Sequence, residues 1–74
     1  MTKYIVTVEV GGNGYIGLES SFGKACQVVL DKVNLWQKQE FISFAKLNSC
    51  SVEGVRYAIY VCHEDGEAEL CVGM

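Results

Sequence analysis

The sequence has few basic residues and no cluster of them. Its 74 residues include six lysines and arginines against nine aspartates and glutamates, which gives a formal net charge of −3. Nucleic acids and anionic membranes are bound through positively charged surfaces. The composition therefore disfavours direct binding to nucleic acid or to a membrane.

The sequence also lacks proline, internal repeats, linkers and low-complexity segments, and we expect a single domain over residues 1–74. No apolar run approaches the roughly 20 residues that span a bilayer. The N-terminal segment MTKYIVTVEV has neither the apolar core nor the cleavage site of a signal peptide. These absences predict a cytoplasmic protein.

The four cysteines do not have the spacing of a metal site. Structural zinc sites bring their ligands as closely spaced pairs. Here no C-x-x-C occurs, and intervals of 24, 12 and 9 positions separate Cys26, Cys50, Cys62 and Cys71. In the cytoplasm we expect free thiols, and we expect no metal or other cofactor.

The segment Ser21–Gln39 is the one convincing amphipathic helix. At about 100° per residue its apolar side chains fall within an arc of about 140°. These side chains belong to Phe22, Ala25, Cys26, Val29, Leu30, Val33 and Trp36. Ser20 or Ser21 is suited to cap the first turn. Val28 and Leu35 lie on the polar side, either as singly exposed hydrophobic residues or as a contact with another chain.

Five segments have the alternation or the β-branched and aromatic content of strands. They are Lys3–Val10, Tyr15–Glu19, Phe41–Cys50, Val55–Glu64 and Glu67–Val72. With the helix they predict an α+β fold of order ββαβββ, in which a single helix packs on one face of an antiparallel sheet. Residues 12–17 match G-x-G-x-x-G, but the pattern runs into a second strand, so it indicates a hairpin turn and not a nucleotide site.

The dipeptide Asp65-Gly66 predicts a two-residue hairpin turn, which fixes the register of the last two strands. In that register Tyr57, Ile59, Val61, Leu70 and Val72 share the face under the helix. The opposite face then carries Arg56, Ala58, Tyr60, Cys62, Glu69 and Cys71. Because one helix covers only one side of a sheet, this semi-apolar second face must meet water or a partner.

Negative charge is concentrated on the last hairpin. It suits a basic groove on another protein, although it is also typical of an ordinary soluble surface. Together with the open sheet face and the two unexplained helix residues, the hairpin supplies the candidate partner-binding residues. These are Tyr60, Arg56, Glu64, Asp65, Glu67, Glu69, Val28 and Leu35.

His63, the sole histidine, lies among these carboxylates, as a general base or a metal ligand would. Strand alternation sends its side chain away from both Cys62 and Glu64, so no catalytic set forms locally. A thiol- or metal-dependent enzyme that uses His63 with Cys62 or Cys71 stays an alternative, and no catalytic or metal residue is assigned.

In size, acidity and the packing of one helix against an antiparallel sheet, the chain resembles small phage-encoded anti-CRISPR and related anti-defence proteins. The resemblance covers YIVTVEV, SFGKACQVVLDKV and VRYAIYVCHEDGEAELCV. It includes no diagnostic motif, so no functional residue is transferred, and the sequence has fewer lysines and arginines than inhibitors that bind through a sheet face. The resemblance implies an inhibitor that binds a nuclease complex in the host cytoplasm.

Half of the residues are hydrophobic, a high apolar content for so short a chain. Small domains often gain stability from a further buried surface. The sequence thus predicts a non-enzymatic protein-binding module that inhibits a host protein or nuclease complex. The alternative is a small homodimer with a structural or ligand-binding role, whose interface is the exposed sheet face or the pair Val28 and Leu35.

Overall fold

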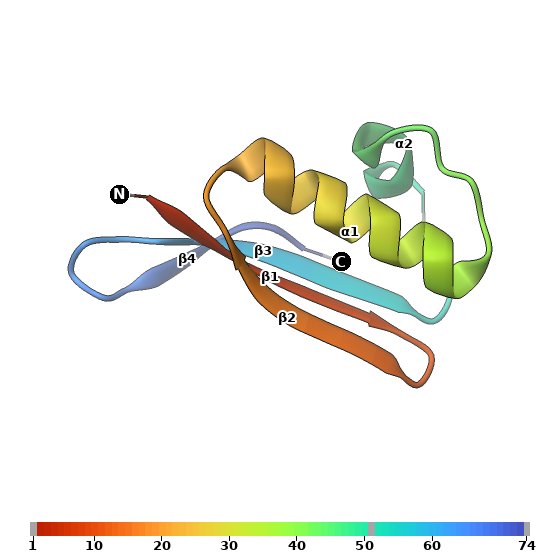
Figure 1. The fold of residues 1–74 in the computed structure, drawn as a ribbon, viewed down its shortest axis with the longest axis horizontal. Coiled ribbons are helices and arrows are strands. Elements are labelled where there is room, and N and C mark those ends of the chain that lie inside the picture. The colour runs from red at the N-terminus through yellow and green to blue at the C-terminus, as the bar shows by residue number, and fades with distance from the viewer. Residues whose placement is uncertain (1, 51, 74) are drawn as a thin grey trace.

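A single long helix, α1 (Phe22–Gln37), lies on one face of a four-stranded antiparallel sheet in the computed structural model, which describes residues 2–50 and 52–73 (Figure 1). The strands are β1 (Lys3–Val10), β2 (Asn13–Glu19), β3 (Val55–Cys62) and β4 (Ala68–Gly73). Their order across the sheet is β2-β1-β3-β4. The α+β class and the packing of one main helix on an antiparallel sheet are confirmed.

Helix α1 begins and ends with clear caps. The Ser21 hydroxyl accepts a hydrogen bond from the Lys24 backbone N–H at 3.2 Å, which satisfies a donor that the first turn leaves unpaired. At the other end Lys38 adopts a left-handed conformation with φ of 57°, and its N–H bonds to the Asn34 carbonyl. Of the predicted apolar stripe, Ala25, Val29, Leu30 and Val33 are buried.

The prediction of a strand over Phe41–Cys50 is wrong. The segment contains a short helix, α2 (Phe44–Asn48), so the order is ββα, short helix, ββ and not ββαβββ. Two side-chain interactions favour this outcome. The Asn34 side chain bonds to both the N–H and the carbonyl of Phe41, at 2.9 and 3.1 Å, and the Ser43 hydroxyl caps α2 by accepting from the Lys46 N–H at 3.2 Å.

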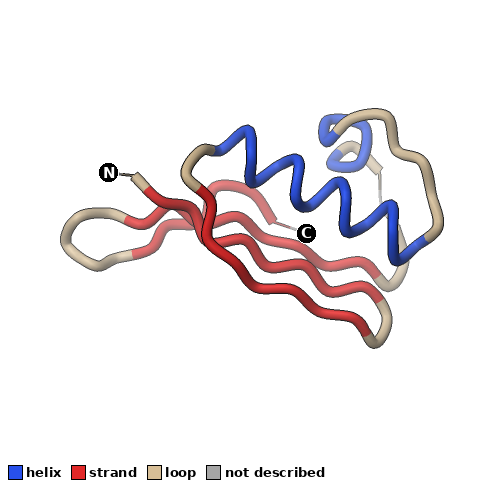
Figure 2. Tube along the Cα trace, viewed as in Figure 1, coloured by secondary structure: helices blue, strands red, loops and turns tan. Residues whose placement is uncertain are grey.

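Helix α2 adds a second cover to the core. Its residue Leu47 is fully buried, and the Phe44 ring meets the Tyr57 ring edge to face, with centroids 5.6 Å apart. The two apolar residues lie three positions apart, so they share one face of a helix. Figure 2 shows both helices on the same side of the sheet.

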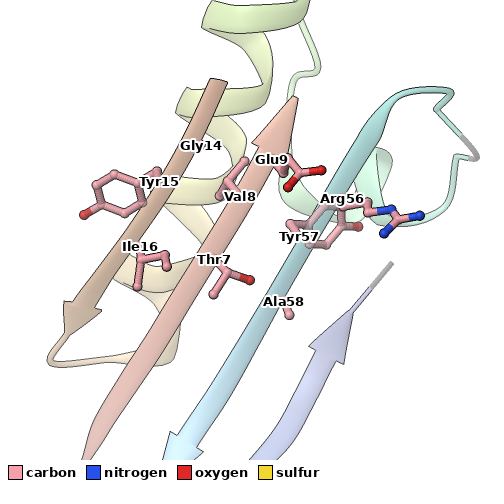
Figure 3. A pocket seen from close by; sticks show the side chains of 9 residues that line it. All are labelled: Thr7, Val8, Glu9, Gly14, Tyr15, Ile16, Arg56, Tyr57 and Ala58. Atoms are coloured by element: carbon pink, nitrogen blue, oxygen red, sulfur yellow. The ribbon is translucent and has the colours of Figure 1, made fainter. Parts of the chain in front are cut away.

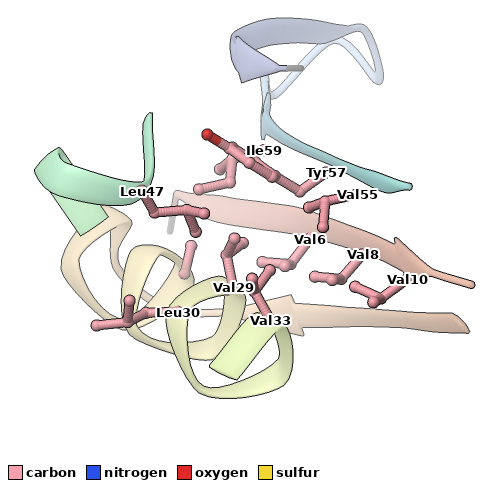
Figure 4. Close-up of a cluster of buried hydrophobic side chains, with 11 residues drawn as sticks. Val6, Val8, Val10, Val29, Leu30, Val33, Leu47, Val55, Tyr57 and Ile59 are labelled. Atoms are coloured by element: carbon pink, nitrogen blue, oxygen red, sulfur yellow. The ribbon is translucent and has the colours of Figure 1, made fainter. Parts of the chain in front are cut away.

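The core lies between the helices and the sheet (Figure 4). Val6, Val8 and Val10 alternate along β1 toward α1, as the sequence predicts. They meet Val29 and Val33 of the helix, and all five are at most 4% exposed. The complete buried set is Val6, Val8, Val10, Ala25, Val29, Leu30, Val33, Leu47, Val55, Tyr57 and Ile59.

The predicted register of the β3–β4 hairpin is wrong by one residue near the turn. The His63 N–H bonds to the Glu67 carbonyl at 2.8 Å, so the loop between them has three residues and ends at Gly66, where φ is 90°. Tyr60 therefore faces Leu70, and Val61 faces Glu69. A β-bulge at Cys71 then restores the predicted pairing of Ile59 with Val72.

The shifted register moves two predicted side chains to the other face. Leu70 lies opposite Tyr60 and not under the helix, and it is 56% exposed. Glu69 lies opposite Val61, on the face that carries the helices. The residues Tyr57 and Ile59 are buried as expected, so the correction concerns β4 alone.

We predict that Leu47→Ala lowers the free energy of unfolding by about 2–5 kcal/mol, because it leaves a cavity where α2 closes the core. That is a large share of the roughly 5–15 kcal/mol typical of a small domain. Urea unfolding measures the change. The control Lys46→Ala, at an exposed position of the same helix, should change it by about 0.5 kcal/mol or less. Equal effects of the two substitutions would contradict the role given to α2.

Candidate functional site

The face of the sheet that the helices leave open carries apolar side chains on all four strands. The strand registers align one row across it, in which Leu18 pairs with Ile5, Ile5 with Tyr60, and Tyr60 with Leu70. A second row contains Ile16, Thr7 and Ala58. We name the apolar members of both rows the apolar band: Ile5, Ile16, Leu18, Ala58, Tyr60 and Leu70.

The apolar band is accessible to solvent. Ile16, Leu18 and Leu70 are 78%, 59% and 56% exposed, while Ile5, Ala58 and Tyr60 are half-buried. Each band residue alternates along its strand with residues that face the helices. The helices that bury the core therefore cannot cover the band. Contiguous exposed apolar surface on a small protein is typical of an interaction site.

One end of the open face is polar. Glu9 of β1 pairs in register with Arg56 of β3, beside the second row of the band. Together with Thr7 and Ile16 they border a depression of about 610 Å³ on this face. Figure 3 shows Glu9 and Arg56 at one end of it and Thr7 and Ala58 farther along the strands. A charged pair at the border of an apolar patch resembles the polar rim of protein interfaces.

The acidic hairpin projects beyond the rest of the sheet (Figure 1). Its tip carries Glu64, Asp65 and Glu67, and all three are exposed. The Asp65 carboxylate accepts a hydrogen bond from the Glu67 N–H at 3.0 Å, so one of these charges has a local structural role in the turn. Glu64 and Glu67 contribute further negative charge to the tip.

The predicted partner-binding residues thus lie in separate places. Tyr60 and Arg56 share the open face, and the three acidic residues of the tip extend past its end. Glu69 lies on the opposite face, where its carboxylate is 3.6 Å from His63 Nε2.

The two helix residues differ in exposure. Val28 is half-buried and packs against the core, whereas Leu35 is 65% exposed on the helix surface.

Of the apolar band only Tyr60 belonged to the predicted site; the five missing residues are Ile5, Ile16, Leu18, Ala58 and Leu70. The alternation of Ile16 and Leu18 around Gly17 was the available signal, because a tight turn at residues 11–12 places both beside the outward residues of β1. Leu70 could not be predicted in this way, since the face on which it lies depends on the length of the turn between β3 and β4.

The structure separates His63 from Cys62, one of the two cysteines of the alternative thiol site. Cys62 lies on the open face, and the next residue, His63, lies on the other. Cys26, Cys50, Cys62 and Cys71 are free thiols. Within residues 2–50 and 52–73 no group of three or more histidine, cysteine, aspartate or glutamate side chains is placed to hold a metal ion. No helix in this part of the chain is long and apolar enough to cross a membrane.

Two titratable groups on the helix side have shifted pKa values. Burial raises the pKa of Tyr57, and the neighbouring Cys26 thiol raises it further. Burial also raises the pKa of Cys26 itself, against a smaller lowering by a backbone hydrogen bond. The Tyr57 hydroxyl donates a hydrogen bond to Asn48 Oδ1 at 2.6 Å. A raised pKa keeps the thiol of Cys26 protonated, which disfavours a nucleophilic role.

In comparisons with family models, curated proteins and solved structures, the chain has no match. The resemblance to anti-CRISPR proteins therefore stays a prediction.

We predict that the protein loses stability at alkaline pH. The pKa values of Tyr57 and Cys26 are higher in the folded chain than in the unfolded chain. The two groups therefore make their full contribution to the free energy of unfolding below their ordinary pKa values of about 9 to 10. It is lost as the pH rises from there through the folded-state values. Urea unfolding between neutral pH and about pH 11 measures the decline.

Two variants separate this effect from general alkaline unfolding. Tyr57→Phe should show a smaller alkaline decline, although it is about 1 kcal/mol less stable at neutral pH because the bond to Asn48 is lost. Tyr60→Phe keeps the buried tyrosine and should decline as the wild type does. An identical decline in all three proteins would show that Tyr57 does not contribute.

Proposed function

We propose that this protein is a non-enzymatic protein-binding module that docks on its partner with the open face of the sheet. The observation that carries the proposal is the apolar band, a set of exposed and half-buried side chains in two rows, one of which crosses all four strands. A folded chain that leaves such a row in water gains free energy when a partner covers it.

The arrangement of the face supports a protein as the occupant. Tyr60 lies in the row between Ile5 and Leu70, and a tyrosine at the centre of an apolar patch is a frequent energetic anchor of interfaces. Arg56 and Glu9 supply a polar border at one end. These features suit a partner with an apolar patch of similar width and a polar rim.

We further propose that the partner is a host protein or nuclease complex and that binding inhibits it. The acidic tip, with Glu64, Asp65 and Glu67, extends beyond the open face and would enter a basic groove beside the docking patch. A groove of that kind holds nucleic acid when it is free, so its occupation by the hairpin would block it. The overall negative charge and the resemblance to anti-defence proteins support the same function.

We predict that Leu70→Ser weakens retention of the partner by about tenfold, because it removes the leucine that extends the apolar band onto β4, beside the central Tyr60. The tagged protein would be used to recover its partner from a lysate of the native host, and the affinity would then be measured with the purified partner. Leu35→Ser is the matched control, since Leu35 is a similarly exposed leucine on the far layer.

The two leucines give the experiment a clear negative result. If both substitutions weaken binding equally, the open face is not the docking surface. If no partner is retained by the wild type, the proposed function fails. Replacement of Glu64 and Glu67 by glutamine tests the inhibitory part separately: affinity should become less dependent on salt while docking through the face persists.

A further inference from the structure

The two edge strands of the sheet differ in how they are protected. Exposed edges invite pairing with another strand, and proteins usually block them with charge, proline or a bulge. Strand β4 has a bulge at Cys71, carries Glu69 and follows the acidic tip. Strand β2 pairs with β1 in an unbroken register, contains no proline, and has only Glu19, at its end, as a charged residue.

The free backbone groups of β2 can be assigned from the ladder. The Gly11 N–H bonds to the Gly54 carbonyl at 3.3 Å, so the odd-numbered residues of β1 direct their backbone toward β3. The even-numbered residues of β1 then bond to β2, because antiparallel strands alternate in this way. Through the register of β1 with β2, the backbone groups of Gly14, Ile16 and Leu18 point away from the sheet.

We propose that two copies of this chain pair through these free β2 edges, antiparallel to each other, and join their sheets into one. A two-fold axis relates the copies, and Ile16 lies at the middle of Asn13–Glu19. Full overlap therefore places Ile16 opposite Ile16 of the second copy and Gly14 opposite Leu18. The outward N–H and C=O groups of Gly14, Ile16 and Leu18 in one copy then face those of Leu18, Ile16 and Gly14 in the other, which gives about six backbone hydrogen bonds.

The same register fits the side chains of β2. On the open face, Leu18 of each copy opposes Gly14 of the other. On the helix side, Tyr15 opposes Gly17, and the Tyr15 ring already lies so close to its own Gly17 that a Cβ there would collide with it. On the open face the bulky Leu18 thus meets a glycine, on the helix side each Gly17 is covered by the Tyr15 of its own copy, and at the ends Glu19 opposes the neutral Asn13.

The glycine at position 14 supports a second copy as the occupant. A glycine inside a strand weakens it and often marks a close approach of another group. Within one chain Gly14 needs no such exception, because it lacks a positive φ and an added Cβ would meet only the Val8 carbonyl, at 4.0 Å. In the paired edge, Gly14 leaves room for Leu18 of the second copy.

Sedimentation equilibrium over about a hundredfold range of concentration tests the proposal. The wild type should form a dimer that dissociates on dilution. Ile16→Pro should weaken the dimer by about tenfold or more, because proline removes an outward N–H and is tolerated at a free edge. Ile16→Lys, which places like charges opposite each other, should weaken it as well.

Tyr60→Lys distinguishes edge pairing from packing of two open faces. Its side chain lies on β3, away from the β2 edge, so this variant should dimerise as the wild type does. A dimer that survives Ile16→Pro and is lost in Tyr60→Lys would overturn the proposal in favour of face packing. A wild type that stays monomeric at the highest concentration would also overturn the proposal. In that case the β2 edge could still pair with a different protein, but not with a second copy of this chain.

Amide hydrogen exchange provides a measurement that does not depend on a variant. The N–H groups of Ile16 and Leu18 should become protected only as the concentration rises, whereas Tyr15 and Gly17, which bond to β1, should be protected throughout. Equal protection of all four at every concentration, or lasting exposure of Ile16 and Leu18 in the dimer, would contradict the proposed pairing.

Discussion

The fold depends on the packing of valines between α1 and β1. Val29 and Val33 of the helix meet Val6, Val8 and Val10 of the strand, and this contact leaves all five almost without exposure. Because side chains alternate along a strand, every residue that turns toward the helix has neighbours that turn away. Helix α1 lies on one side of the sheet (Figure 2) and can cover that face only. The open face is therefore a direct consequence of the way the core is built.

The short helix α2 completes the covered side without changing that result. Leu47 fills the space beside Ile59 and Tyr57, while Asn34 holds the start of the connecting segment at Phe41. The segment 41–50 therefore packs against the core on the helix side of the sheet and does not add a strand to it. As a consequence the sheet keeps β2 and β4 as its edges, and the open face stays four strands wide.

The sequence predicted those elements in which one periodicity and clear end signals agree. Helix α1, with its cap at Ser21, and the alternation of β1 belong to this group. The segment Phe41–Cys50 was mispredicted because its apolar residues fit a strand and a short helix about equally well. The deciding contacts come from Asn34 in α1, seven positions before Phe41, and from burial of Leu47. Tertiary contacts of this kind leave no local signal.

The candidate site was predicted in part for a related reason. The open face and its residues Tyr60 and Arg56 follow from the alternation of β3 alone. Leu70 does not, because Asp65-Gly66 fits both a two-residue turn and a three-residue turn, and the two differ by one position in register. The bulge at Cys71 returns Val72 to the expected face, so the predicted register is wrong only between the turn and Cys71. Leu70, which extends the apolar band onto β4, lies in that short stretch and was therefore predicted on the wrong face.

Ile16 and Leu18 connect the open face with the free edge. Their side chains belong to the apolar band, and their backbone groups point out of the sheet. These two exposures differ physically: covering the side chains is non-directional, whereas pairing the backbone requires a strand in one register. A dimer formed by face packing would hide the band and leave the β2 edge unpaired. A dimer formed through the edge keeps both open faces on one side of the joined sheet, because its two-fold axis is perpendicular to the sheet. Edge pairing therefore extends the docking surface and, unlike face packing, is compatible with the proposed binding of a partner by both copies.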